Sequence, residues 1–290
     1  MEPLTRALRS LDGLSVGDAF GELFFMPGEA AYRFIRARAI PGGSWRYTDD
    51  TEMAISIVEV LAEHGSVDQD ALAAAFAARM DPSRRYGAGA YGILTAIREG
   101  LPWERASRGA FHGRGSFGNG AAMRVAPLGA YFADDLERCV AEARLSSEIT
   151  HAHEEGIAGG VAIALATALC WRHRNEPLAP TAFLEAVREL CPESYTREGI
   201  EAALRLPEEA DVVQAAQALG NGSGVTAPDT VPLCLWLAAR HSGRHVDGRY
   251  VDALWETVAA LGDRDTTCAI VGGILAMSAP VPAEWLERRE

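Results

Sequence analysis

Apolar residues recur along most of this 290-residue chain at the three- and four-residue spacing of an amphipathic α-helix. In residues 52–65, EMAISIVEVLAEHG, one face carries Met53, Ile57 and Leu61, and Gly65 stands where a left-handed C-cap would end the helix. The same spacing recurs in residues 68–80, 91–100, 181–190, 211–220, 231–241 and 250–262. No stretch alternates polar and apolar residues long enough to predict a β-strand. The sequence therefore predicts an all-α fold with loops marked by glycine and proline.

The chain carries no repeat, low-complexity tract or linker that would divide it. Its most loop-like stretches, residues 221–230 and 174–181, are too short to separate independent domains. With 48% hydrophobic residues the chain can bury a large core. We expect one compact domain over residues 1–290 and, by default for this size, a monomer.

The charge balance excludes several classes of protein. A formal net charge of -13 argues against binding nucleic acid or an anionic membrane surface, because both are held by clustered cations. All 27 basic residues are arginine, which excludes chemistry that needs a Schiff-base or P-loop lysine.

The cysteines and apolar stretches point to the cytoplasm. The five cysteines are odd in number, widely spaced and form no C-x-x-C pair, so a reducing compartment fits best. The N-terminus has no signal-type apolar run. Residues 156–171, GIAGGVAIALATALCW, are too few to span a membrane and predict a buried, tightly packed helix.

Two adjacent carboxylates stand between threonines in YTDDTEMAIS, residues 47–56, just before an apolar helix. Thr48 or Asp50 could be an ordinary N-cap, and acidic side chains are favoured in a first helical turn. Asp49 adds more negative charge than a cap requires.

A second acidic cluster stands near the other end of the chain, where Asp263, Asp265 and Thr266 again precede an apolar helix. Together the clusters supply an all-oxygen ligand set, which suits Mg²⁺, Mn²⁺ or Ca²⁺, and four carboxylates could hold two such ions. Two independent helix caps are the alternative. The stretch DRDTT also fits an aspartyl phosphotransferase motif, but it follows a helical segment near the end of a chain without lysine, which argues against that class.

A glycine-rich stretch, GRGSFGNGAAMRVAPLGAYF, occupies residues 113–132. Its glycines can adopt positive φ and let another group approach the backbone closely, so consecutive backbone N–H groups could bind an anion. These glycines are Gly113, Gly115, Gly118 and Gly120. We expect a helix to begin near Ala121 and add its dipole; a plain loop is the alternative. Phe117 could stack on a base or fill the core.

Five segments, in this order, resemble the signatures of the ADP-ribosylglycohydrolase family. They are GLSVGDAFGE (13–22), WRYTDDTEMA (45–54), GSFGNGAAMRVAPLG (115–129), ITHAHEEGIAGGVAIA (149–164) and LGDRDTTCAIVGGILA (261–276). The resemblance implies a compact, single-domain orthogonal helical bundle with two Mg²⁺ or Mn²⁺ ions at the base of an ADP-ribose cleft.

The family's motifs imply a role for individual residues. The metal ligands would be Thr48, Asp49, Asp50, Asp263, Asp265 and Thr266. Diphosphate contacts and an aromatic partner for the adenosine would come from Gly115, Ser116, Phe117, Gly118, Asn119 and Gly120. His151 would also face ADP-ribose, and Gly87 and Gly89 would line the cleft. His153 is expected to be a surface residue.

Catalysis would require a positioned water and a base, because cleavage at the ribose anomeric carbon passes through an oxocarbenium-like state. Asp49 or Asp50 could accept the proton. Many relatives carry glutamate at the position of Phe25, so here Glu22 is an alternative catalytic residue. Arg264, between two predicted ligands, is expected to face solvent, since alternate residues of an extended segment point in opposite directions.

The predicted function is metal-dependent hydrolysis of the bond between ADP-ribose and an acceptor. A protein side chain is the favoured acceptor, with arginine favoured over serine. One alternative is a non-catalytic ADP-ribose-binding or structural relative, which Phe25 keeps open. Another is a hydrolase of a small-molecule or nucleic-acid conjugate of ADP-ribose.

Overall fold

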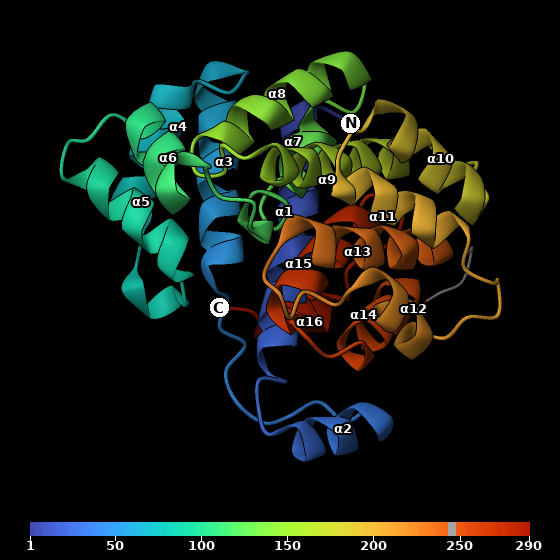
Figure 1. Ribbon diagram of the computed structural model, residues 1–290. Helices are drawn as coiled ribbons and strands as arrows, with labels where there is room; N and C mark the ends of the chain where they lie inside the picture. Colours follow the sequence, from blue (N-terminus) through green and yellow to red (C-terminus); the bar gives the residue numbers. More distant parts are fainter. Residues whose placement is uncertain (243–247) are drawn as a thin grey trace.

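The computed structural model describes residues 1–242 and 248–290, and within them the chain is helical with no β-strand (Figure 1). The all-α prediction is confirmed. The α-helices are α1 (Pro3–Glu22), α2 (Gly28–Arg36), α3 (Asp49–His64), α4 (Gln69–Arg79), α5 (Ala88–Arg98), α6 (Trp103–Gly113), α7 (Ala126–Tyr131), α8 (Leu136–Glu148), α9 (Glu154–Arg172), α10 (Pro180–Leu190), α11 (Tyr195–Leu204), α12 (Val212–Leu219), α13 (Ala227–Ser242), α14 (Arg249–Ala259), α15 (Arg264–Leu275) and α16 (Ala283–Arg288). Two 3₁₀ turns, η1 (Pro82–Arg84) and η2 (Asn119–Ala121), lie between them.

The ends of α3 follow the sequence signals. Its N-cap is Thr48, whose hydroxyl accepts a hydrogen bond from the Asp50 N–H, and its C-cap is Gly65 with φ +70°. The prediction that a helix begins near Ala121 is wrong. Asn119–Ala121 form only a 3₁₀ turn, and α7 begins at Ala126. Pro127 explains this start, because its fixed φ suits the first turn of a helix.

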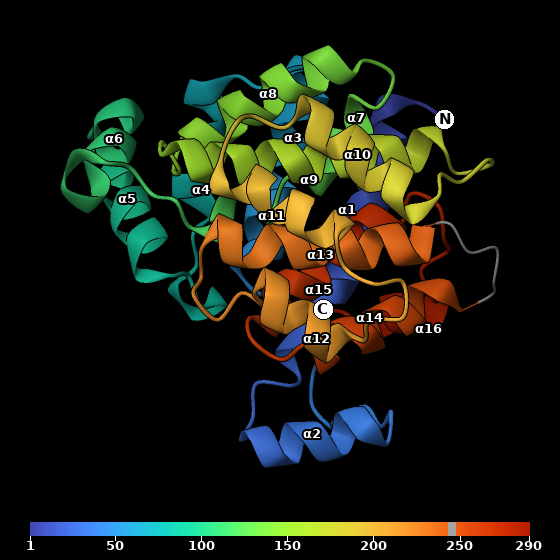
Figure 2. The same ribbon diagram turned by 45° about the vertical axis from the view of Figure 1, so that its right-hand side comes forward.

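Helix α9 forms the centre of the core. It is the one described helix long and apolar enough to cross a membrane by length and composition, but 94% of its most apolar window is buried. It packs against α7, α8 and α13 in the middle of the molecule (Figure 2). Gly159 and Gly160 permit these contacts, since a Cβ at Gly160 would lie 2.3 Å from Ser147 Oγ. The prediction of a buried, tightly packed helix is confirmed.

Helices α1 and α15 come from opposite ends of the chain and lie side by side (Figure 1). One face of α1 carries Gly13, Gly17 and Gly21, and each touches the α15 backbone. A Cβ at Gly17 would lie 2.1 Å from Cys268 O, and one at Gly21 would lie 2.1 Å from Arg264 O. This close packing fixes the C-terminal half of α1 against the first turn of α15.

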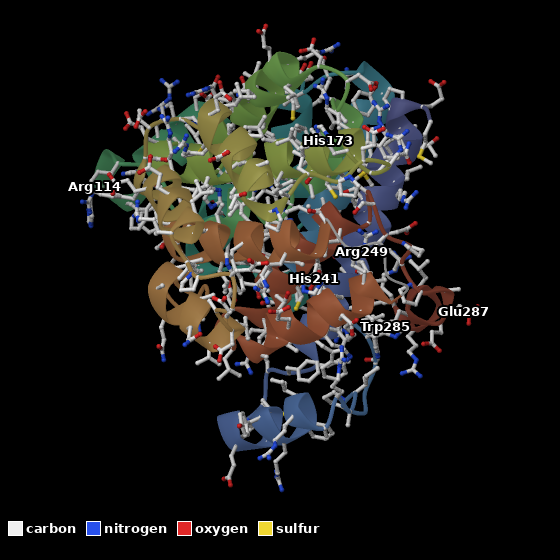
Figure 3. All side chains as sticks on the ribbon, turned by 90° about the vertical axis from the view of Figure 1, so that its right-hand side faces the viewer. Arg114, His173, His241, Arg249, Trp285 and Glu287 are labelled. Atoms are coloured by element: carbon white, nitrogen blue, oxygen red, sulfur yellow. The ribbon has the colours of Figure 1, made fainter. Side chains whose placement is uncertain are left out.

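The C-terminal helix α16 closes the end of this helix pair. Trp285 turns toward the body of the protein and Glu287 lies at the outer edge (Figure 3). The indole stacks on Phe20 of α1 with ring centroids 4.8 Å apart, and it also meets Trp45. The aromatic cluster therefore supports the segment that leads into α3. Helix α2, between α1 and that segment, projects from the rest of the bundle (Figures 1 and 2).

Candidate functional site

A cavity of about 380 Å³ opens where the N-termini of α3 and α15 meet the glycine-rich loop. Most of the predicted site residues line it: Asp49, Asp50, Gly87, Gly89, Ser116, Phe117, Gly118, Asn119, Gly120, His151, Asp263, Asp265 and Thr266. The structure thus brings together residues from five separate segments of the sequence. Thr48, Gly115 and Glu22 are not part of the lining.

Four carboxylates form the acidic floor of this cavity: Asp49 and Asp50 at the start of α3, and Asp263 and Asp265 at the start of α15. Burial and then the Asp18 carboxylate raise the pKa of Asp49 to about 8. Burial and neighbouring carboxylates also hold the pKa of Asp50 and Asp265 well above the ordinary value. Each acid therefore increases the cost of ionising the next, which a bound cation would reverse.

Asp18 is a buried carboxylate beneath this floor that the sequence analysis missed. It accepts hydrogen bonds from the Thr48 N–H (2.9 Å), the Thr51 N–H (3.2 Å) and the Thr51 hydroxyl (2.6 Å). Thr48 Oγ1 lies 2.9 Å from both Asp18 Oδ1 and Asp50 Oδ2. Burial, opposed by these hydrogen bonds, raises the pKa of Asp18 to about 6. Thr48 and Asp18 therefore lie behind the acidic floor and orient it.

The donor chemistry of the floor fits divalent cations. Asp50 Oδ1 is buried and has no hydrogen-bond partner, so one carboxylate oxygen has unused ligand capacity. The surrounding donors are all oxygens, which suit Mg²⁺ or Mn²⁺. Within residues 1–242 and 248–290, no three acidic, imidazole or thiol groups are already arranged to hold a metal ion. The floor therefore supplies suitable donor atoms without a preformed set of ligands.

Asn119 connects the acidic floor to the glycine-rich loop. Its amide donates to Asp263 Oδ2 at 2.8 Å and to Thr230 Oγ1 at 3.1 Å. Asp263 occupies the N-cap position of α15, but its side chain makes no capping hydrogen bond. This carboxylate is therefore held toward the loop and the cavity, and the helix-cap alternative does not account for it.

The glycine-rich loop differs from the expected anion cradle. Gly113 and Gly115 do adopt positive φ, but Gly118 and Gly120 do not. The Gly118 N–H donates to Ser116 Oγ at 3.2 Å, and the Asn119 N–H donates to Val225 O at 3.2 Å. The expectation that these consecutive N–H groups point together at an anion is wrong, because the protein already satisfies both.

Close packing against His151 explains the last two glycines of the loop. A Cβ on Gly120 would lie 2.8 Å from His151 Cε1, and one on Gly118 would lie 3.3 Å from His151 Nε2. The other ring nitrogen, Nδ1, lies 2.8 Å from Thr150 Oγ1. Burial and then Arg124 lower the pKa of His151 to about 3. His151 is therefore a neutral, fixed ring facing the cavity at physiological pH.

Aromatic side chains form one wall of the cavity. Phe117 is 41% exposed, and its ring centroid lies 5.4 Å from that of His153. His153, expected at the surface, is half-buried and caps α9 by accepting a hydrogen bond from the Glu155 N–H. Phe111 adds a second ring, 47% exposed, and a Cβ on Gly89 would lie 2.9 Å from it. No pattern in the sequence distinguished Phe111 from an ordinary apolar helix residue.

The backbone around the cavity is strained. Six described residues other than glycine have positive φ, and three of them, Arg85, Phe111 and Val225, line this cavity. Left-handed backbone is a genuine outlier for a β-branched residue such as valine. Such conformations concentrate at functional sites because the surrounding structure must hold them in place.

Arg264 does not face solvent, contrary to the sequence-based expectation. The residue is half-buried, its Nη1 donates to Phe24 O at 2.7 Å, and its guanidinium lies 4.8 Å from the Phe25 ring. The expectation assumed an extended segment, but Arg264 is the first residue of α15. Helical geometry turns it toward the end of α1, and its guanidinium still interacts electrostatically with Asp263 and Asp265.

The helical fold and its acidic, aromatic-walled cavity fit the class of all-α glycohydrolases. The sequence model of the family described as ADP-ribosylglycohydrolase matches residues 1–290. The chain belongs to the ADP-ribosylglycohydrolase family and is a hydrolase.

Individual relatives agree with this membership. An uncharacterized protein of Archaeoglobus fulgidus is 29% identical over 298 residues, covering 95% of this chain and 88% of its own. ADP-ribosylhydrolase ARH3 of Bos taurus is 28% identical over 84% of this chain and 74% of its own. ADP-ribosylarginine hydrolase Tri1 of Pseudomonas putida is 27% identical over 99% and 75%. A solved ADP-ribosylglycohydrolase-related protein complex, 23% identical, shares the fold with a TM-score of 0.64 over 100% of this chain and 93% of that chain.

Proposed function

We propose that this protein hydrolyses the glycosidic bond between ADP-ribose and an acceptor, with two divalent cations, Mg²⁺ or Mn²⁺, bound at the acidic floor. The observation that carries the proposal is the buried, unpartnered Asp50 Oδ1 among carboxylates that raise one another's pKa. A cation site explains why the fold concentrates this charge without a basic partner at the floor. ADP-ribose and an ADP-ribosylated acceptor are the corresponding ligands.

The six predicted ligands would divide into two layers. Asp49, Asp50, Asp263, Asp265 and Thr266 line the cavity, whereas Thr48 lies behind it in contact with Asp18. Bound cations would supply positive charge that orients the ribose hydroxyls and lowers the pKa of water. Asp49 or Asp50 would accept the proton of the attacking water. Neutral His151 and the loop that it packs against would position the ligand.

The rest of ADP-ribose would extend along the aromatic wall. Phe111 and Phe117 are both about half exposed, although large aromatic side chains usually bury more of their surface, so they offer ring faces to an adenine base. Ser116 and the Gly87 to Gly89 segment lie along the same cavity and would contact the diphosphate.

Release of ADP-ribose tests the proposal directly. Peptides carrying arginine-linked and serine-linked ADP-ribose, together with a base-linked conjugate, are incubated with Mg²⁺ or Mn²⁺ and again with EDTA. Release that requires the metal supports the hydrolase and tells whether arginine is the preferred acceptor, as the sequence favours. Equal divalent metal in the purified protein and in Asp265→Ala, measured by plasma mass spectrometry, would refute the ligand assignment.

A second candidate function is ADP-ribose binding without turnover. Phe25 stands where the family resemblance implies a glutamate, and Glu22, the nearby alternative, is engaged in an ion pair with Arg85. This candidate predicts ADP-ribose binding with no release from any conjugate. The cytoplasmic location and the monomeric state stay predictions.

A further inference from the structure

Four side chains meet beside the acidic floor and form what we term the rim cluster: Glu22, Phe25, Arg85 and Arg264. The Phe25 ring, 38% exposed, lies between the two guanidinium groups, 5.0 Å from that of Arg85 and 4.8 Å from that of Arg264. Both distances are within the range of cation–π attraction. A neutral aromatic ring thus holds two like charges near each other at one edge of the site.

The rim cluster carries a net positive charge. Its single carboxylate, Glu22, is paired with Arg85. Arg264 donates to the backbone oxygens of Phe24 and Gly262, and its guanidinium also interacts electrostatically with Asp263 and Asp265 of the floor. Once cations neutralise the floor carboxylates, the two arginines and Glu22 leave an excess of one positive charge. This excess stands out in a chain whose net charge is -13.

The cluster adjoins the acidic floor. Arg264 stands between the cavity-lining Asp263 and Asp265, and Glu22 ends the helix that carries Asp18. Arg85 itself lines the cavity. A ligand with its ribose over these carboxylates would therefore bring its acceptor close to Arg85 and Arg264.

We infer that the rim cluster makes Arg85 and Arg264 determinants of acceptor specificity, favouring oxygen-linked ADP-ribose whose acceptor peptide carries acidic side chains and disfavouring guanidinium-linked or basic acceptors. The inference rests on the proposed function and deepens it, and it argues against the arginine preference expected from the sequence. With cations bound at the floor, a cationic acceptor would be repelled by Arg85 and Arg264, whereas an acidic one would be attracted.

The bond chemistry favours the same acceptor. The oxygen of water bonds to the anomeric carbon, the bond from that carbon to the acceptor oxygen breaks, and its electron pair stays on the acceptor oxygen. Water gives one proton to a floor carboxylate, and the departing oxygen takes up one proton. Because negative charge develops on that oxygen in the transition state, a nearby fixed guanidinium stabilises departure.

The test compares three ADP-ribosylated peptides: serine-linked with acidic flanking residues, serine-linked with basic flanking residues, and arginine-linked. The first two share one linkage, so their kcat/KM ratio isolates the effect of charge. We expect the acidic-flank peptide to exceed the basic-flank peptide about tenfold at low ionic strength, and the ratio to fall with added salt. Arginine-linked peptide should be the poorest substrate.

Three variants accompany the wild type. Arg85→Asn removes the charge and suits the left-handed backbone at this position, φ +67°. Phe25→Glu adds a carboxylate between the two arginines. We expect the first variant to lower the flank ratio severalfold and the second to bring it close to one. Arg172→Gln is the matched control, because this exposed arginine lies at the end of α9 remote from the cavity and should leave the ratio unchanged.

The outcomes separate the possibilities. A flank ratio near one in the wild type, with release from all peptides, would overturn the inference and leave the proposed function standing. A fall in affinity for free ADP-ribose in Arg85→Asn, measured by calorimetry, would show that Arg85 binds the diphosphate and would also overturn it. Failure of every peptide to release ADP-ribose would overturn the proposed function and this inference together.

Discussion

The contact between α1 and α15 gives a quantitative prediction for Gly17→Ala. The new Cβ would lie 2.1 Å from Cys268 O, whereas ordinary contacts begin at 3.4 Å. Backbone atoms cannot rotate away as a side chain could, so the two helices must separate. Overpacking of this kind costs about 1–3 kcal/mol, and the contact with backbone places this site at the upper end of that range. The better helix propensity of alanine offsets about 1 kcal/mol.

We therefore expect Gly17→Ala to lower the free energy of unfolding by about 2 kcal/mol and the melting temperature by roughly 4–8 °C. Urea unfolding followed by circular dichroism measures the first quantity, and calorimetry measures the second. Gly92→Ala is the control, because Gly92 lies within α5 with nothing within 4 Å of the added Cβ. That variant should gain up to about 1 kcal/mol. Equal free energies of unfolding for the two variants would refute the close spacing of α1 and α15.

Three further predictions concern the site. In metal-free protein the native state holds extra protons, since the pKa of Asp18 is raised to about 6 and that of Asp49 to about 8. The free energy of unfolding should then fall as pH rises from about 4 to 8, and saturating Mg²⁺ should remove this slope; an identical slope with and without Mg²⁺ in urea titrations would count against cation binding. Asp18→Asn should weaken Mg²⁺ binding roughly tenfold or more, as loss of outer-shell partners does, measured by titration calorimetry against wild type. Phe117→Leu should weaken ADP-ribose binding about tenfold, since base stacking contributes roughly 1–3 kcal/mol, with the melting temperature unchanged; unaltered affinity would remove Phe117 from the adenine site.

Periodicity and end signals in the sequence were enough to predict helices such as α3, α4 and α10, because each signal depends on residues close to one another in the chain. Helices α1, α2 and α8 were not among the predicted segments. Thr48 and Gly65 cap α3 as expected. The start near Ala121 failed for a non-local reason: Asn119 is held by Asp263 and Thr230, from distant segments. A local pattern carries no information about such a partner.

The parts of the candidate site that could be predicted are those where several unusual residues cluster in the sequence. The acidic pairs and the glycine-rich loop are such clusters, whereas a single residue of an ordinary type gives no signal. Asp18 could not be predicted as a site residue, since a single aspartate within a helix is most often exposed. It is buried because α3 packs against α1. Phe111 and Arg264 likewise owe their positions to backbone conformations that the sequence pattern did not reveal.

The pairing of α1 with α15 has a consequence for the order in which the protein folds. The acidic floor combines Asp49 and Asp50 with Asp263 and Asp265, so it forms by closing most of the sequence into one loop. Contacts of such high sequence separation form slowly, and on a growing chain α15 is made long after α1. The glycine face of α1 therefore stays uncovered until α15 packs against it. Binding of a divalent cation would then require the complete fold. A chain that ends before the acidic cluster of α15 would contain only two of the four floor carboxylates, Asp49 and Asp50.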